Sequence, residues 1–130
     1  LACEATPLLR QFNNRIDLAK LQWGLGALLR GQGKIAEAIE AYRVAQKEFA
    51  ELEMRADIAA IQLVVADLLL ATGQPQQAEW EIRAALPVIE EYELVPEGYA
   101  ALSLLRESLR RRQIDRQALR DLHGYFRDDQ

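Results

Sequence analysis

The chain has 130 residues, a length typical of one domain, and half of them are apolar, as in globular proteins. Its formal net charge of -4 disfavours nucleic acid as the main partner, because binding to a phosphate backbone needs a basic face. A single cysteine excludes an internal disulfide, and the longest apolar stretch, residues 58–71, is too short and too polar to span a bilayer. We therefore expect a cytoplasmic protein that has no membrane partner.

Helical periodicity runs almost from end to end and predicts an all-α protein of six helices, preceded by the end of an earlier one. Residues 1–12 are interpreted as the end of a second helix that belongs to a truncated upstream repeat. Asn13 and Asn14 then precede the first long helix, over about residues 15–31. Gly33 follows it, because glycine readily adopts the left-handed conformation that ends helices.

The second and third helices are expected over about residues 34–54 and 57–72. Pro75 and Pro96 open the fourth and fifth helices, since the missing N–H of proline is tolerated in a first turn. Asp115 can cap a sixth helix. The short connections predict that consecutive helices are antiparallel neighbours.

Three alanines, Ala38, Ala78 and Ala118, recur with a 40-residue period, and the same apolar skeleton surrounds each of them. The equivalent positions include Leu25/Val65/Leu105, Leu29/Leu69/Leu109, Gly33/Gly73/Gln113 and Tyr42/Ile82/Leu122. A fixed period of this length predicts a solenoid, whose units must stack to bury their apolar faces. We expect a single domain over residues 1–130, with repeats at 15–54, 55–94 and 95–130. The last repeat is interpreted as a degenerate C-terminal cap.

Individual residues lead to further structural predictions. Pro87 lies inside the fourth helix, where proline removes a backbone hydrogen bond, and predicts a kink or break near Leu86. The third helix is apolar on nearly all sides and is expected at the centre of the stack, beside the first and fifth helices. Within it Asp67 needs a partner, which Arg30 or Arg110 can supply. We favour such a structural ion pair over a role for Asp67 in ligand recognition.

The first unit resembles the tetratricopeptide repeat (TPR) family, whose signature matches Leu25-Gly26, Leu29, Gly33, Ala38, Tyr42 and Ala45. The second unit keeps the pattern from Val65-Ala66 to Ala85. The third has Arg106 in place of the small residue and Gln113 in place of the turn glycine. The period is longer than the one usual in the family, as in long-period bacterial-type repeats. The resemblance implies a right-handed superhelical solenoid of antiparallel helix pairs.

In the TPR family the first helices of successive units line a concave, partner-binding face. Carried onto this chain, the side chains on that face are Lys20, Trp23, Ala27, Arg30, Leu63, Asp67, Leu70, Ser103, Glu107, Arg110 and Arg111. Trp23 either forms an apolar platform there with Ala27 and Leu63 or packs on the upstream repeat. The sequence leaves these two placements open.

Six arginines lie between residues 106 and 120, where only Glu107 and Asp115 oppose them. The cluster marks either a contact for an acidic partner or a solvated cap face. We favour the solvated face, because helical spacing spreads these arginines around two helices and few aromatic residues lie between them.

No catalytic group can be assembled, because His123 is the only histidine and Cys3 the only cysteine. We expect no enzymatic activity, no metal and no cofactor. The leading hypothesis is a non-catalytic protein-interaction module, a TPR scaffold that binds a peptide or helix of a partner protein through its concave face. The alternative is a sensory or regulatory TPR domain of a larger bacterial signalling or transcription-regulatory protein, which binds a small ligand or peptide.

Self-association through the exposed repeat edges is a third hypothesis. The apolar residues expected at these edges are Leu8, Leu9, Phe12 and Trp23.

Overall fold

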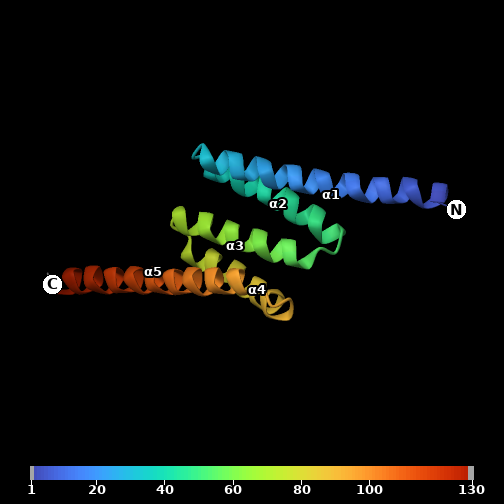
Figure 1. The fold of residues 1–130 in the computed structure, drawn as a ribbon. Helices are drawn as coiled ribbons and strands as arrows, with labels where there is room; N and C mark the ends of the chain where they lie inside the picture. Colours follow the sequence, from blue (N-terminus) through green and yellow to red (C-terminus); the bar gives the residue numbers. More distant parts are fainter. Residues whose placement is uncertain (1, 129–130) are drawn as a thin grey trace.

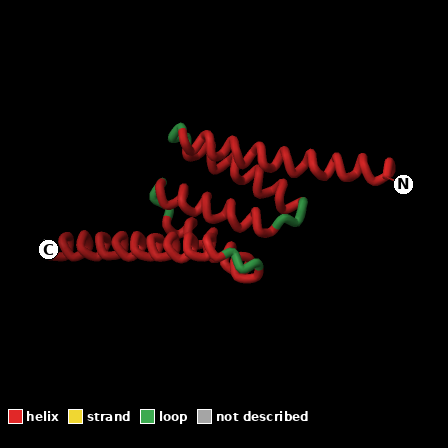
Figure 2. Tube along the Cα trace, in the orientation of Figure 1, coloured by secondary structure: helices red, strands yellow, loops and turns green. Residues whose placement is uncertain are grey.

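The computed structural model describes the backbone of residues 2–128 and the side chains of residues 8, 10–113, 116, 117 and 120. Within this part the chain is all-α. Its helices are α1 (Ala2–Gly31), α2 (Ile35–Glu51), α3 (Arg55–Ala71), α4 (Pro75–Glu91) and α5 (Val95–Asp128). The all-α prediction is confirmed, and short turns join the helices (Figures 1 and 2).

Helices that follow one another in the chain pack together. The helix pairs in contact are α1 with α2, α2 with α3, α3 with α4, and α4 with α5, and α3 also contacts α5. The ends of α1 and α5 project beyond the packed region in opposite directions (Figure 1). The described chain is therefore a row of helices with an outer helix at each end.

Four turns of one type connect the helices. Gly33 and Gly73 have positive φ values of 79° and 73°, and Glu53 and Glu93 have φ values of 57° and 53°. At each turn the next amide N–H donates to a carbonyl five residues back, for example from Lys34 to Leu29. This is the Schellman motif, in which a left-handed residue ends a helix. The turns are evenly spaced along the chain, at half the period of the repeat.

The repeat period is present in the packing of the second helices. The buried residues of α2 are Ala38, Ala41, Tyr42, Ala45 and Phe49. The buried residues of α4 are Ala78, Glu81, Ile82, Ala85 and Ile89, which occupy the same positions one repeat later. The two helices therefore bury the same face.

Ion pairs at the ends of the hairpins follow the same period. Arg15 of α1 pairs with Glu51 of α2 at 2.7 Å. One repeat later, Arg55 of α3 pairs with Glu91 of α4 at 2.9 Å. The hairpins α1–α2 and α3–α4 are thus equivalent in their polar contacts as well as in their core.

The expected turns at residues 13 and 113 are absent. α1 continues through Asn13 and Asn14, so the predicted separate helix over residues 1–12 is wrong. α5 continues through Gln113 and Asp115, so the predicted sixth helix is also wrong. α1 and α5 are each one long helix, where two helices joined by a turn were expected.

The absence of the last turn has two physical causes. Gln113 stands where Gly33 and Gly73 take positive φ. A residue with a Cβ pays roughly 1–2 kcal/mol for that conformation, a cost that Glu53 and Glu93 bear at turns whose two helices pack together. Arg106 stands at the position of Gly26, where an added Cβ would lie 2.9 Å from the Tyr42 ring. A second helix cannot cross α5 that closely at Arg106, so the hairpin has nothing to stabilise it.

The continuation of α1 through Asn13 has a different cause. In the described part of the chain α2 is the only helix that packs closely against α1, so a turn at Asn13 would gain no packing there. Continuing the helix keeps its backbone hydrogen bonds. The repeat period therefore predicts a turn at Asn13, but no packing contact stabilises a turn there.

Pro87 does not break α4. The helix runs from Pro75 to Glu91 with Pro87 exposed inside it, so the break predicted near Leu86 is wrong, while a bend there stays a prediction. A proline removes one helical hydrogen bond. Because α4 packs on both α3 and α5, those contacts hold the helix together across this position.

The central place of α3 is confirmed in its burial and in most of its neighbours. Nine of its residues are buried, from Ala59 to Leu70, and it packs on α2, α4 and α5. Its expected neighbour α1 does not pack closely against it in the described part of the chain. These two helices are joined instead by a side-chain ion pair.

The equivalence of the buried alanines predicts a position-specific effect on stability. Ala78 of α4 is 0% exposed, whereas Ala84 of the same helix is exposed. Ala78→Leu should lower the free energy of unfolding by about 1–3 kcal/mol, because overpacking displaces the neighbouring helix. Ala84→Leu should be close to neutral. Urea denaturation of both variants measures this difference, and equal stabilities would contradict the tight crossing at Ala78.

Candidate functional site

A groove between α3 and α5 gathers six of the eleven predicted site residues. Its volume is about 430 Å³. The predicted residues that line it are Asp67, Leu70, Ser103, Glu107, Arg110 and Arg111, and the others are Ala71, Leu104 and Arg106. Ser103, Arg106 and Arg110 are exposed, so the groove is open to solvent along this rim.

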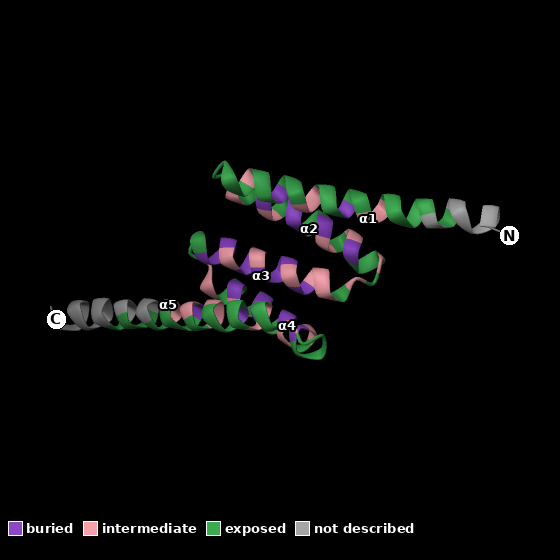
Figure 3. Ribbon diagram, in the orientation of Figure 1, coloured by how far each residue is buried: buried purple, intermediate pink, exposed green. Residues whose placement is uncertain are grey.

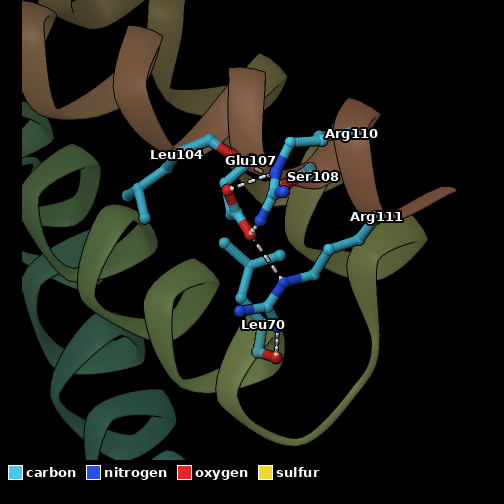
Figure 4. Close-up of polar contacts among 6 residues, drawn as sticks. All are labelled: Leu70, Leu104, Glu107, Ser108, Arg110 and Arg111. Atoms are coloured by element: carbon cyan, nitrogen blue, oxygen red, sulfur yellow. Dashed lines mark hydrogen bonds and ion pairs between the residues drawn. The ribbon is translucent and has the colours of Figure 1, made fainter. Parts of the chain in front are cut away.

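Glu107 organises the arginines on one wall of the groove (Figure 4). Arg110 donates two hydrogen bonds to its carboxylate, from Nη2 at 2.9 Å and from Nε at 3.1 Å. Arg111 donates a third from Nε at 2.9 Å. Hydrogen bonds from Arg110 and Arg111 lower the pKa of Glu107 to about 2. The carboxylate is therefore ionised at neutral pH and fixes both guanidinium groups.

Arg111 also joins the two helices that form the groove. Its Nη1 donates a hydrogen bond to the backbone carbonyl oxygen of Leu70, in the last turn of α3 (Figure 4). A cation at a helix C-terminus is favourable because the last carbonyl groups carry partial negative charge. This contact sets the position of α5 against the end of α3.

Asp67 lies at the other side of the groove and is paired with Arg30 of α1 at 2.5 Å. The predicted ion pair is confirmed, with Arg30 as the partner. Both side chains are nearly half exposed, at 44% and 46%, so solvent screens the pair and it contributes little to stability. Its main consequence is geometric, because it ties α1 to α3.

Arg106 differs from the other arginines of the groove. Among the described side chains no ion pair or hydrogen bond involves it, and it is exposed. Both carboxylates of the groove are already bound by Arg30, Arg110 and Arg111. The groove therefore presents an unneutralised guanidinium beside the half-buried side chain of Leu104.

The remaining predicted site residues lie outside the groove. Lys20 and Ala27 are exposed on α1, and Leu63 is buried in the core at 6% exposure, which leaves little of it for a partner. Trp23 is half-buried and packs edge-on against Phe49 of α2, with ring centroids 5.9 Å apart and an angle of 84°. Neither placement expected for Trp23 is shown, since its ring contact is within its own hairpin.

The arginine cluster divides into structural and exposed members. Arg112 pairs with Glu79 of α4, as does Arg83. Burial raises the pKa of Glu79, but hydrogen bonds from Arg83 and Arg112 outweigh it and leave that pKa lowered. Arg116 and Arg120 are exposed. Arg111 and Arg112 therefore join α5 to α3 and α4, whereas Arg110 bonds to Glu107 within α5.

Several residues singled out in the sequence lie outside the described side chains. They are Cys3, Leu9, Asp115, Ala118, Leu122 and His123. Within the described residues, no three histidine, cysteine or acidic side chains gather as metal ligands. No helix of the described part combines the length and apolar character needed to cross a bilayer.

Comparisons with protein-family models, curated proteins and solved structures found no match for this chain. A proposal about its function therefore depends on the geometry of the groove and on the repeat.

The low pKa of Glu107 predicts how the groove responds to acid. Because the folded-state pKa lies below the ordinary value of 4.5, the ion pairs stabilise the fold above about pH 4.5 and lose that effect as pH falls toward 2. Glu107→Gln should lower the urea midpoint at pH 6 but have little effect near pH 2. Glu40→Gln, at an exposed position on α2, is the control. An equal loss for Glu107→Gln at both pH values would contradict this assignment.

Proposed function

We propose that the chain is a non-catalytic protein-interaction module of the TPR-like class, which binds a peptide or helix of a partner protein along the first-helix side of the repeat. The observation that carries the proposal is the groove between α3 and α5. It gathers side chains from equivalent helices of successive units, as expected where a solenoid presents a binding surface.

The chemistry of the groove favours a partner segment with an acidic side chain next to an apolar one. Arg106 offers a guanidinium without a protein partner, and the exposed side chain of Arg110 lies one turn away. Guanidinium groups bind carboxylates through paired N–H donors. The half-buried side chain of Leu104 supplies apolar contact beside these charges.

A binding role suits the protonation states of the groove better than catalysis. Glu107 is held ionised by two arginines, with a pKa of about 2, and so is a poor proton donor near neutral pH. Asp67 is engaged by Arg30. The carboxylates of Glu107 and Asp67 are thus held by their arginine partners, and Arg106 is left to contact a bound segment.

The second candidate function is a sensory or regulatory domain of a larger bacterial signalling or transcription-regulatory protein. The groove volume of about 430 Å³ favours it, because ligand pockets of small molecules have such volumes. Against it, the exposed rim leaves the groove open, and Trp23 lies outside the groove. A cytoplasmic location is part of either proposal.

The test is a selection from a library of random peptides displayed on phage, followed by titration of a selected peptide into the purified chain. Peptides with aspartate or glutamate beside a large apolar residue should be enriched. Arg106→Gln should weaken their binding by about tenfold, equivalent to about 1.4 kcal/mol. Binding should also weaken as salt is added.

The matched control is Arg10→Gln, at another exposed arginine, on α1 and away from the groove. This variant should bind the selected peptides like the wild type. Equal affinity of Arg106→Gln and the wild type, or selection of peptides without acidic residues, would contradict the proposed chemistry. Tight binding of small molecules but of no peptide would favour the sensory function.

A further inference from the structure

The outward side of α1 carries four exposed leucines, which we call the leucine stripe: Leu18, Leu21, Leu25 and Leu28. Their exposed fractions are 57%, 66%, 42% and 59%. Spacings of three, four and three residues place them on one side of the helix. Figure 3 shows exposed residues along much of α1. The apolar stripe is thus in contact with solvent over about three turns.

In α3 and α5, the positions equivalent to the leucine stripe can be compared with it. One repeat later, Ile61, Val65 and Leu68 of α3 are at most 2% exposed. Two repeats later, Ala101 and Ser108 of α5 are 0% exposed. The helices that precede them in the chain, α2 and α4, pack on α3 and α5. The face is therefore one that this architecture covers with another helix, and in the described chain α1 leaves it open.

The stripe is complementary to a copy of itself. Leucines that alternate at three and four residues form the seam of a two-helix coiled coil. One turn beyond its ends lie Asn14 and Gln32, which are exposed and uncharged. Burying the stripe against an identical one therefore removes apolar surface from water without burying a charge. Exposed apolar patches with polar borders are typical of protein–protein contacts.

Gly24 supplies an independent observation beside the stripe. It is exposed in the middle of α1, and apart from its chain neighbours and the nearby backbone of its own helix no atom lies within 4 Å of the place where its Cβ would be. The packing of the single chain therefore gives no reason for a glycine, which destabilises a helix interior relative to alanine. A second helix laid on the stripe gives one, because glycine lets two helix backbones approach closely.

We propose that a second copy of this chain docks on the leucine stripe, with the two α1 helices antiparallel about a two-fold axis. Leu18 then meets Leu28 of the second copy, Leu21 meets its Leu25, and Gly24 lies near the axis. A parallel pairing is disfavoured because its heptad register sets Arg10 beside Arg15 of the other copy. The contact uses none of the residues that line the groove, so it is independent of the proposed peptide binding.

Sedimentation equilibrium from micromolar to near-millimolar concentration tests the dimer. The wild type should show a monomer–dimer equilibrium, and Leu21→Glu should raise its dissociation constant at least about tenfold, because each copy loses one leucine contact and gains a carboxylate in the seam. Leu21 is exposed, so circular dichroism should show an unchanged helix content.

Two control variants test the other exposed apolar edges. Leu8→Glu, in the part of α1 outside the stripe, and Leu102→Glu, on α5, alter side chains that are 70% and 61% exposed. Both should dimerise like the wild type. A wild type that stays monomeric, or a dimer that is lost with Leu8→Glu or Leu102→Glu but not with Leu21→Glu, overturns the proposal.

Disulfide trapping tests the orientation, with Cys3→Ser in every variant to remove the native thiol. Asn14→Cys mixed with Gln32→Cys should form a mixed disulfide dimer under mild oxidation, because these positions meet in the antiparallel arrangement. Asn14→Cys alone should stay largely uncrosslinked, because its two cysteines lie at opposite ends of the antiparallel contact. Efficient crosslinking of Asn14→Cys to itself would show a parallel pair and overturn the antiparallel one.

Discussion

The fold depends on the close crossing of the two helices in each hairpin, which only small side chains permit. At Gly26 there is no room for a methyl group beside the Tyr42 ring, and Ala66 holds the same position in the second hairpin at 0% exposure. The second helices meet this crossing with Ala38 and Ala78, which are also fully buried. Dispersion contacts between two helices are strong only where their surfaces fit closely. Small residues therefore decide which helices can pair.

The same constraint explains how far the fold could be predicted from the sequence. The repeat spacing identified the buried faces of α2 and α4 and the turns at Gly33 and Gly73, because there every position of the pattern is occupied by a suitable residue. It failed at the third hairpin, where Ala118 keeps the spacing but Arg106 and Gln113 do not. A hairpin needs a turn that tolerates positive φ and a crossing free of bulk, and one matching alanine supplies neither.

The prediction of the candidate site succeeded for the ion pair of Asp67 and failed for Leu63, whose place depends on how α3 is rotated against its neighbours. Arg30 pairs with Asp67 as expected, although both side chains are nearly half exposed, so burial did not force the pairing. The placement of Leu63 on the binding face came from positional analogy, which does not fix how a helix is rotated against its neighbours. Leu63 consequently lies in the core, while Ala71 and Leu104, which no motif singles out, line the groove.

The contacts that hold the first helices together also shape the groove they form. Arg30 ties α1 to α3 through Asp67, and Arg111 ties α5 to α3 through the Leu70 carbonyl while Glu107 fixes its orientation. Arg30 and Arg111 are therefore already engaged in contacts within the protein. Arg106, which prevents a second helix from closing over α5, is the one cation of the groove for which the described structure supplies no partner. Because Arg106 stands at the position of a small residue, it blocks the close crossing that a further hairpin would need, and its charge lies without a described partner at the groove between α3 and α5.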